Sequence, residues 1–113
     1  MNIQIWGKSK CFETKKAERW FKERRIKFQY IDIVRYGISL GEYRSIKQAL
    51  GSVEVLIDNK SREYNDLYIA YLAHKADIEQ KLLENPRLFK TPIVRNGKYA
   101  SVGFCPDIWK EWK

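Results

Sequence analysis

The first third of the sequence changes its hydrophobic period twice, and this pattern restricts the folds that the chain can adopt. Residues 2–6 alternate between polar and apolar side chains, which is typical of a half-buried strand. Residues 14–25 carry an apolar stripe at helical spacing that includes Trp20 and Phe21. Residues 28–33 (FQYIDI) alternate again and are rich in strand-forming residues. These segments predict a strand–helix–strand unit, whose right-handed crossover makes the two strands parallel.

The remainder of the sequence predicts a helical region, a hairpin and a last helix. Helical structure is expected over residues 41–50, 53–57 (a short helix or turn), 65–74 and 77–84. The dipeptide Asn96-Gly97 is a strong hairpin signal and is expected to join strands at residues 92–95 and 98–102. Pro106 can occupy the first turn of a final helix.

The predicted order of elements describes a single α/β domain. With 113 residues the chain is long enough for one domain with a hydrophobic core. The order is βαβ, a helical insert over about residues 38–86, and then ββα. No apolar run approaches the roughly 20 residues that a membrane span requires, and no signal peptide opens the sequence. We therefore expect a cytoplasmic protein without membrane contact.

Cys11 is the strongest candidate for a reactive group. It follows a Gly-Lys-Ser-Lys turn and directly precedes the first predicted helix, where unpaired backbone N–H groups and the helix dipole favour a negative charge. Lys8, Lys10 and Lys15 add positive charge nearby. All of these features favour the thiolate, which is the attacking form of cysteine. We therefore expect a lowered pKa for the Cys11 thiol.

The excess of positive charge lies at the cysteine end of the chain. The net charge is +8, and residues 1–35 contain ten Lys or Arg against four Asp or Glu. A solvated basic helix face accounts for this excess, and no recognition-helix or RNP pattern predicts direct nucleic-acid binding. His74 is expected near the end of a helix, in a surface or dipole role. The two cysteines lack metal-ligand spacing, so no metal site is expected.

Three motifs, in order along the chain, resemble the arsenate reductase-like (ArsC/Spx) family of the thioredoxin/glutaredoxin superfamily. Residues 11–17 (CFETKKA) resemble the C-x-x-x-[RK]-K-A opening of that family. Residues 83–94 (LENPRLFKTPIV) resemble its L-x-x-x-P-x-L-I-K-R-P-I-I signature, and residues 102–104 (VGF) its V-G-F segment. The resemblance implies a thioredoxin-like, glutaredoxin-type, four-stranded mixed sheet with a helical insert between strands two and three. It also implies that Cys11 is the nucleophile.

The chain departs from the family pattern at the arginines of arsenate-reducing members. By alignment these three arginines correspond to Asp58, Thr91 and approximately Cys105. A carboxylate repels an oxyanion, and threonine offers one weak donor in place of a charged fork. Lys60 or Lys90 can supply part of the missing charge, but arsenate is not expected to be the natural substrate.

A second departure concerns the resolving thiol. Redox-regulated members carry a C-x-x-C pair, whereas in this sequence Thr14 occupies the position of the second cysteine. The hydroxyl of Thr14 can cap the helix or donate to the Cys11 thiolate, and the two roles are compatible. Cys105 is expected two strands from Cys11, roughly 10 Å away, which is too far for a disulfide without loop movement. We therefore prefer a structural free cysteine at this position over a resolving thiol.

The resemblance implies a cis bond between Thr91 and Pro92, which places the Thr91 backbone beside the Cys11 sulfur, where a thiol or peptide can bind.

Two functions remain open after these comparisons with the family pattern. The first function is a monothiol reductase without a bound cofactor, with glutathione, glutaredoxin or a protein thiol as the partner that resolves its mixed disulfide. The second is an Spx-like regulator that binds the RNA polymerase alpha subunit. The missing C-x-x-C pair favours the reductase.

Overall fold

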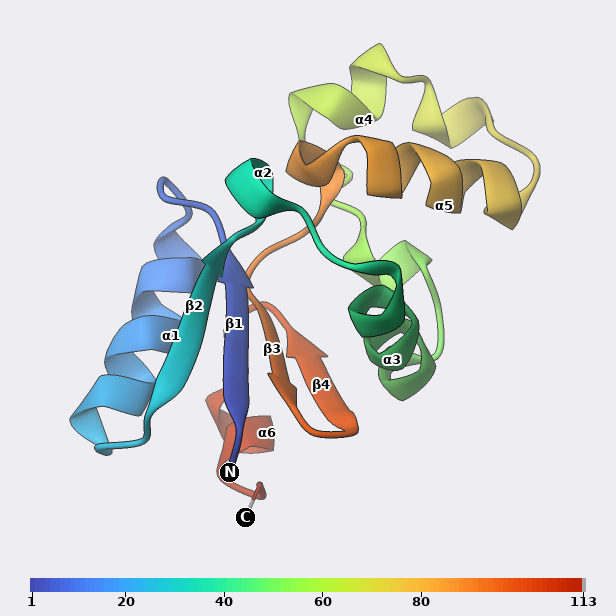
Figure 1. Ribbon diagram of the computed structural model, residues 1–113. Helices are drawn as coiled ribbons and strands as arrows, with labels where there is room; N and C mark the ends of the chain where they lie inside the picture. The colour runs from blue at the N-terminus through green and yellow to red at the C-terminus, as the bar shows by residue number, and fades with distance from the viewer. Residues whose placement is uncertain (113) are drawn as a thin grey trace.

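A four-stranded mixed sheet with strand order β2-β1-β3-β4 forms the centre of the computed structural model, which describes residues 1–112 (Figure 1). The strands are β1 (Ile3–Gly7), β2 (Phe28–Asp32), β3 (Ile93–Asn96) and β4 (Tyr99–Val102). Strand β1 is parallel to β2 and antiparallel to β3, and β3 is antiparallel to β4. The predicted mixed sheet is therefore confirmed, and β4 runs parallel to β1 with β3 between them.

The helices occupy both faces of the sheet and one end of it (Figure 1). They are α1 (Phe12–Glu23), α2 (Ile33–Tyr36), α3 (Leu40–Leu50), α4 (Arg62–Asp66), α5 (Lys75–Glu84) and α6 (Pro106–Trp109). Short 3₁₀ turns are η1 (Glu54–Leu56), η2 (Ile69–Tyr71) and η3 (Pro86–Leu88). The helical insert between strands two and three is thus present. In the described part of the chain, no helix is both long enough and apolar enough to cross a membrane.

Strand β1 lies between two hydrophobic clusters because its side chains alternate between the faces of the sheet. Ile3 and Ile5 pack with Phe21 of α1 and Trp109 of α6 on one face. Trp6 packs on the other face with side chains of α3, α5 and η3. All four tryptophans are at most 8% exposed, which agrees with the expected packing role.

Helix caps and side-chain hydrogen bonds hold the insert together, and a backbone bond connects it to the segment before β3. Ser39 and Glu42 form a reciprocal capping box at the start of α3. Tyr43 Oη and Lys47 Nζ both donate to Glu79 Oε2, at 2.8 and 2.7 Å, and so join α3 to α5. Asp58 N donates to Leu88 O at 2.9 Å, which connects the middle of the insert to the segment before β3.

The predicted helix over residues 65–74 is wrong. Helix α4 ends at Asp66, and Tyr68 adopts a left-handed conformation with φ of 55°, which interrupts the helix before η2. His74 consequently lies at the N-cap of α5 rather than late in a helix, so the predicted dipole role is wrong, whereas its exposed side chain agrees with the predicted surface role. The apolar period arises because Leu67 at the end of α4, and Ile69 and Leu72 in and after η2, all pack against the same hydrophobic cluster.

Candidate active site

Cys11 is the N-cap residue of α1, with extended backbone angles of φ −85° and ψ 118°. The chain leaves β1 at Gly7 and makes a turn in which Cys11 N donates to Lys8 O at 3.0 Å. This turn brings the sulfur to the first turn of the helix, where backbone N–H groups have no partner within the helix. Cys11 itself is partly exposed. The N-cap role falls to Cys11 and not to Thr14, which is the third residue of the helix.

Thr14 lies beneath the cysteine in a space that only glycine at position 7 leaves open. The Thr14 side chain is 1% exposed, and its Oγ1 has no hydrogen-bond partner among the described residues 1–112. A Cβ atom added to Gly7 would lie 2.3 Å from Thr14 Cγ2 and 3.0 Å from Tyr30 Cε1. The buried hydroxyl is thereby kept available for the Cys11 thiolate.

The pKa of the Cys11 thiol is lowered. Partial burial acts in the opposite direction and raises this pKa, but it is outweighed by the hydrogen bonds that the thiolate can accept from the side chains of Thr14 and Thr91 and from the backbone of Thr14 and Glu13. Hydrogen bonds to the charged form are therefore the main cause of the shift, ahead of the lysine charges that the sequence suggested. A lowered pKa increases the fraction of thiolate near neutral pH.

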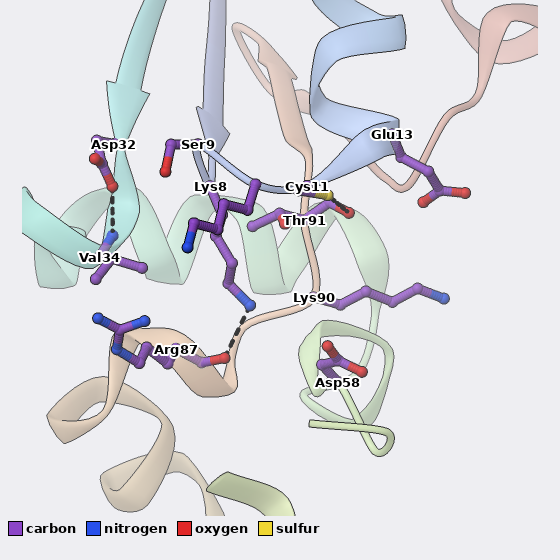
Figure 2. A pocket seen from close by; sticks show the side chains of 11 residues that line it. Lys8, Ser9, Cys11, Glu13, Asp32, Val34, Asp58, Arg87, Lys90 and Thr91 are labelled. Carbon is purple, nitrogen blue, oxygen red and sulfur yellow. Dashed lines mark hydrogen bonds between the residues drawn. The ribbon is translucent and has the colours of Figure 1, made fainter. Parts of the chain in front are cut away.

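Thr91 faces Cys11 from the segment that precedes β3. The bond between Thr91 and Pro92 is cis, which confirms the expectation from the family pattern. Cys11 Sγ lies 3.6 Å from Thr91 O, and the thiol donates to this carbonyl (Figure 2). An incoming group that reaches the sulfur therefore also meets the backbone of residue 91.

The sulfur borders a cleft of about 700 Å³ between the β1–α1 turn, the end of β2 and the segment before β3 (Figure 2). Its charged lining consists of Lys8, Lys10, Arg87, Lys90, Glu13, Asp32 and Asp58. Four basic and three acidic side chains give this cleft a mixed character with little net charge. Such a lining suits a ligand that carries both signs of charge better than a simple oxyanion.

The predicted basic residues divide into two groups in the structure. Lys8, Lys10 and Lys90 line the cleft with Cys11. Lys15 instead lies on an exposed face of α1, and Lys60 lies in a neighbouring hollow outside the cleft, so neither faces the sulfur. Arg87 was not predicted: η3 brings its side chain into the cleft. The only signal for it in the sequence is its position within the motif of residues 83–94.

Cys105 does not line the cleft, and its side chain is packed within the protein. Its Sγ donates to Val102 O at 3.2 Å, and the side chain packs against the cluster formed by α1 and α6. Burial raises the pKa of the Cys105 thiol, and the carboxylate of Glu13 raises it further. Strand β3 separates the two strands that lead to Cys11 and Cys105. Among residues 1–112, no cluster of three or more His, Cys, Asp or Glu could hold a metal ion.

Comparison with known proteins gives matches over almost the whole chain. The ArsC family model matches residues 6–112. Global transcriptional regulator Spx 2 of Oceanobacillus iheyensis is 28% identical over 131 residues, which cover 100% of this chain and 94% of that protein. An arsenate reductase from Vibrio cholerae superposes with a TM-score of 0.86 at 24% identity, covering 98% of this chain and 97% of that one. An ArsC family related protein from Bacteroides fragilis gives 0.87 at 23% identity, covering 100% and 98%. These structures share the fold of this chain.

Proposed function

This chain belongs to the ArsC family, and from that premise we propose that it is a monothiol oxidoreductase with Cys11 as the nucleophile. The observation that carries the proposal is the Cys11 sulfur at the N-cap of α1, with a lowered pKa and an open cleft beside it. A thiolate in such a position is suited to attack on a sulfur–sulfur bond.

The proposed reaction proceeds in two exchanges that balance in sulfur and charge. The Cys11 thiolate attacks one sulfur of an oxidised substrate disulfide, forms a mixed disulfide and releases the other sulfur as a thiolate. A second thiol, such as glutathione, glutaredoxin or a protein thiol, gives its proton to solvent and attacks the mixed disulfide as a thiolate, which releases the Cys11 thiolate. The half of the substrate that was bound to Cys11 leaves as a new disulfide with that thiol. Cys105 takes no part in this route, because it is packed and its pKa is raised.

The cleft supports glutathione as the co-substrate. This tripeptide carries two carboxylates and one ammonium group, so it needs cationic and anionic partners at the same site. Arg87 and Lys90 can bind carboxylates, and Asp32 or Asp58 can bind the ammonium group. The backbone of Thr91 can pair with an extended peptide whose sulfur reaches Cys11.

Arsenate reduction is expected to be slow or absent. With glutathione and glutaredoxin supplied, we expect little turnover, because Asp58 lines the cleft at a position where arsenate-reducing relatives carry arginine. Arg87 provides one guanidinium, but three carboxylates share the same space. The measurement is a coupled assay of arsenate reduction, with Asp58→Arg as a comparison. Efficient turnover that saturates at low arsenate concentration would contradict this prediction.

The test of the proposal is the pH dependence of Cys11 alkylation by iodoacetamide. We expect a pKa below the value of about 8.5 that is typical of a free cysteine. Thr14→Val should raise the pKa of Cys11 and slow alkylation at pH 7 about fivefold, because it removes one hydroxyl donor to the thiolate. Thr14→Ser keeps that donor and should resemble the wild type. A wild-type profile like that of free cysteine would refute an activated nucleophile.

The relatives also support a second candidate function, that of a transcriptional regulator. The chain matches Global transcriptional regulator Spx 2 of Oceanobacillus iheyensis over 100% of its own length, whereas the similar Vibrio cholerae structure carries the name arsenate reductase. In this alternative the protein binds the RNA polymerase alpha subunit and turns over no substrate. Pull-down with purified alpha subunit, run beside a thiol-exchange assay, separates the two: binding without exchange supports the regulator, and exchange without binding supports the reductase.

A further inference from the structure

Lys8 connects the loop that carries Cys11 to the segment that carries Thr91. We infer that Lys8 is a positioning residue, whose ammonium group holds the Thr91 backbone in place beside the Cys11 sulfur. This inference rests on the proposed thiol chemistry of Cys11, and it assigns Lys8 a role through geometry in addition to its charge.

The hydrogen bonds of Lys8 cross from one end of the chain to the other. Its Nζ donates to Arg87 O at 2.8 Å and to Phe89 O at 2.6 Å (Figure 2 draws the first of these bonds). These carbonyls belong to residues that are 79 and 81 positions away in the sequence. Because the ammonium group is charged, both are charge-assisted bonds, which are stronger than bonds between neutral groups.

The segment of residues 87–90 is held along both of its edges. On one edge, Asp58 N donates to Leu88 O at 2.9 Å and Lys90 N donates to Leu56 O at 2.7 Å. On the other edge, the two alternate carbonyls point to Lys8 and not to a neighbouring strand. The lysine therefore takes the place of a strand partner on the side of this segment that faces the cleft.

The position of this link explains its expected effect on the cysteine. Lys8 is three residues before Cys11, and Phe89 is two residues before Thr91. The 3.6 Å contact between the Cys11 sulfur and the Thr91 carbonyl thus lies directly beyond the linked residues. If the link is lost, the Thr91 segment keeps its packing, its bonds to the insert and the bond from Gly103 N to Pro92 O, but it loses its attachment to the loop that carries Cys11. The Thr91 hydroxyl is then no longer held where it can donate to the Cys11 thiolate.

Lys10 provides a matched control for the charge of Lys8. Both lysines line the same cleft, but Lys10 is exposed and its Nζ forms no hydrogen bond with any residue in the described range 1–112. Burial lowers the pKa of Lys8, whereas the charges of Asp58 and Cys11 raise it, so Lys8 and Cys11 also influence each other electrostatically. An experiment must therefore separate the hydrogen bonds from the field.

The experiment compares Lys8→Met, Lys8→Arg and Lys10→Met in the full-length protein. The first readout is the pH profile of Cys11 alkylation, and the second is amide hydrogen exchange over residues 86–92 by mass spectrometry. For Lys8→Met we expect alkylation at pH 7 to slow about tenfold, because the Thr91 hydroxyl, which donates to the thiolate and lowers the pKa of Cys11, is no longer held in place. Exchange over residues 86–92 should accelerate at the same time. Lys8→Arg should restore much of both readouts, since a guanidinium can also donate to two carbonyls.

The possible outcomes each decide the inference. Slower alkylation together with faster exchange in Lys8→Met, with little change in Lys10→Met, supports the positioning role. Slower alkylation with unchanged hydrogen exchange would assign the effect to charge and overturn the inference. Faster hydrogen exchange with an unchanged Cys11 alkylation profile would also overturn it, because the Thr91 segment would then not influence the cysteine. If Lys8→Met does not fold, the inference is decided by whether Lys8→Arg keeps both wild-type readouts. Failure of the proposed function is distinct, since the wild type itself would then alkylate like free cysteine.

Discussion

Replacing Cys11 by serine is expected to abolish thiol–disulfide exchange, with a residual rate at least about a thousandfold below that of the wild type, because the reaction loses its nucleophile. Cys105→Ser should exchange at the wild-type rate, because this thiol is bonded to Val102 O, packs against the core and has a raised pKa. The measurement is the rate of reduction of a small disulfide in the presence of glutathione. The two variants are matched, since each removes one of the two cysteines of the chain.

Mass spectrometry of the oxidised protein tests the same mechanism directly. After oxidation with glutathione and digestion without reductant, we expect a glutathione adduct on Cys11 in both the wild type and Cys105→Ser. An intramolecular disulfide requires Cα atoms within about 7 Å, whereas strand β3 separates β1 from β4 in the sheet. A dominant crosslink between Cys11 and Cys105, lost in Cys105→Ser, would overturn the monothiol mechanism and make Cys105 the resolving thiol.

Gly7→Ala is expected to damage both the fold and the cysteine. The added Cβ would lie 2.3 Å from Thr14 Cγ2, so the Thr14 side chain must move. We expect the free energy of unfolding to fall by about 2–3 kcal/mol, as in other overpacked cores. The pKa of Cys11 should rise, because the displaced Thr14 hydroxyl no longer donates to the thiolate. Denaturant unfolding and the iodoacetamide profile measure the two effects.

Two further variants show whether the clash is the cause. Gly7→Ala combined with Thr14→Ser removes Cγ2 but retains the hydroxyl, so it should recover much of the stability and of the lowered Cys11 pKa. Gly41→Ala, in α3, is the control, because a Cβ there meets no heavy atom within 4 Å. It should cause no loss and could add up to about 1 kcal/mol, since alanine favours a helix over glycine. Equal destabilisation by Gly41→Ala would show that the effect of Gly7→Ala is not steric.

The lowered pKa of Cys11 changes how the basic end of the chain is understood. The sequence suggested that Lys8, Lys10 and Lys15 create a field that stabilises the thiolate. In the structure, Lys15 faces away from the cleft, and hydrogen bonds from α1 and Thr91 are the main cause of the shift. Because hydrogen bonds act over short distances, the reactivity of this thiol should depend on the exact placement of Thr14 and Thr91 more than on the number of lysines.

The sequence determined those features that depend on local patterns. Alternating and helical periods located β1, α1 and β2, because each segment buries one stripe of its own residues. Asn96-Gly97 located the hairpin of β3 and β4 for the same kind of reason. The position of Cys11 at the start of a helix, and the cis bond before Pro92 from the family pattern, also needed no tertiary structure.

Only the tertiary structure decided which charged side chains meet the sulfur. The predicted helix over residues 65–74 failed because a left-handed Tyr68 and separate buried turns can produce the same apolar period as one helix. Arg87 enters the cleft while Lys60 does not, because a side chain's direction is set by how the insert packs on the sheet. The bonds of Lys8 to residues about 80 positions away have no local signature at all, since they exist only once the two ends of the chain pack together.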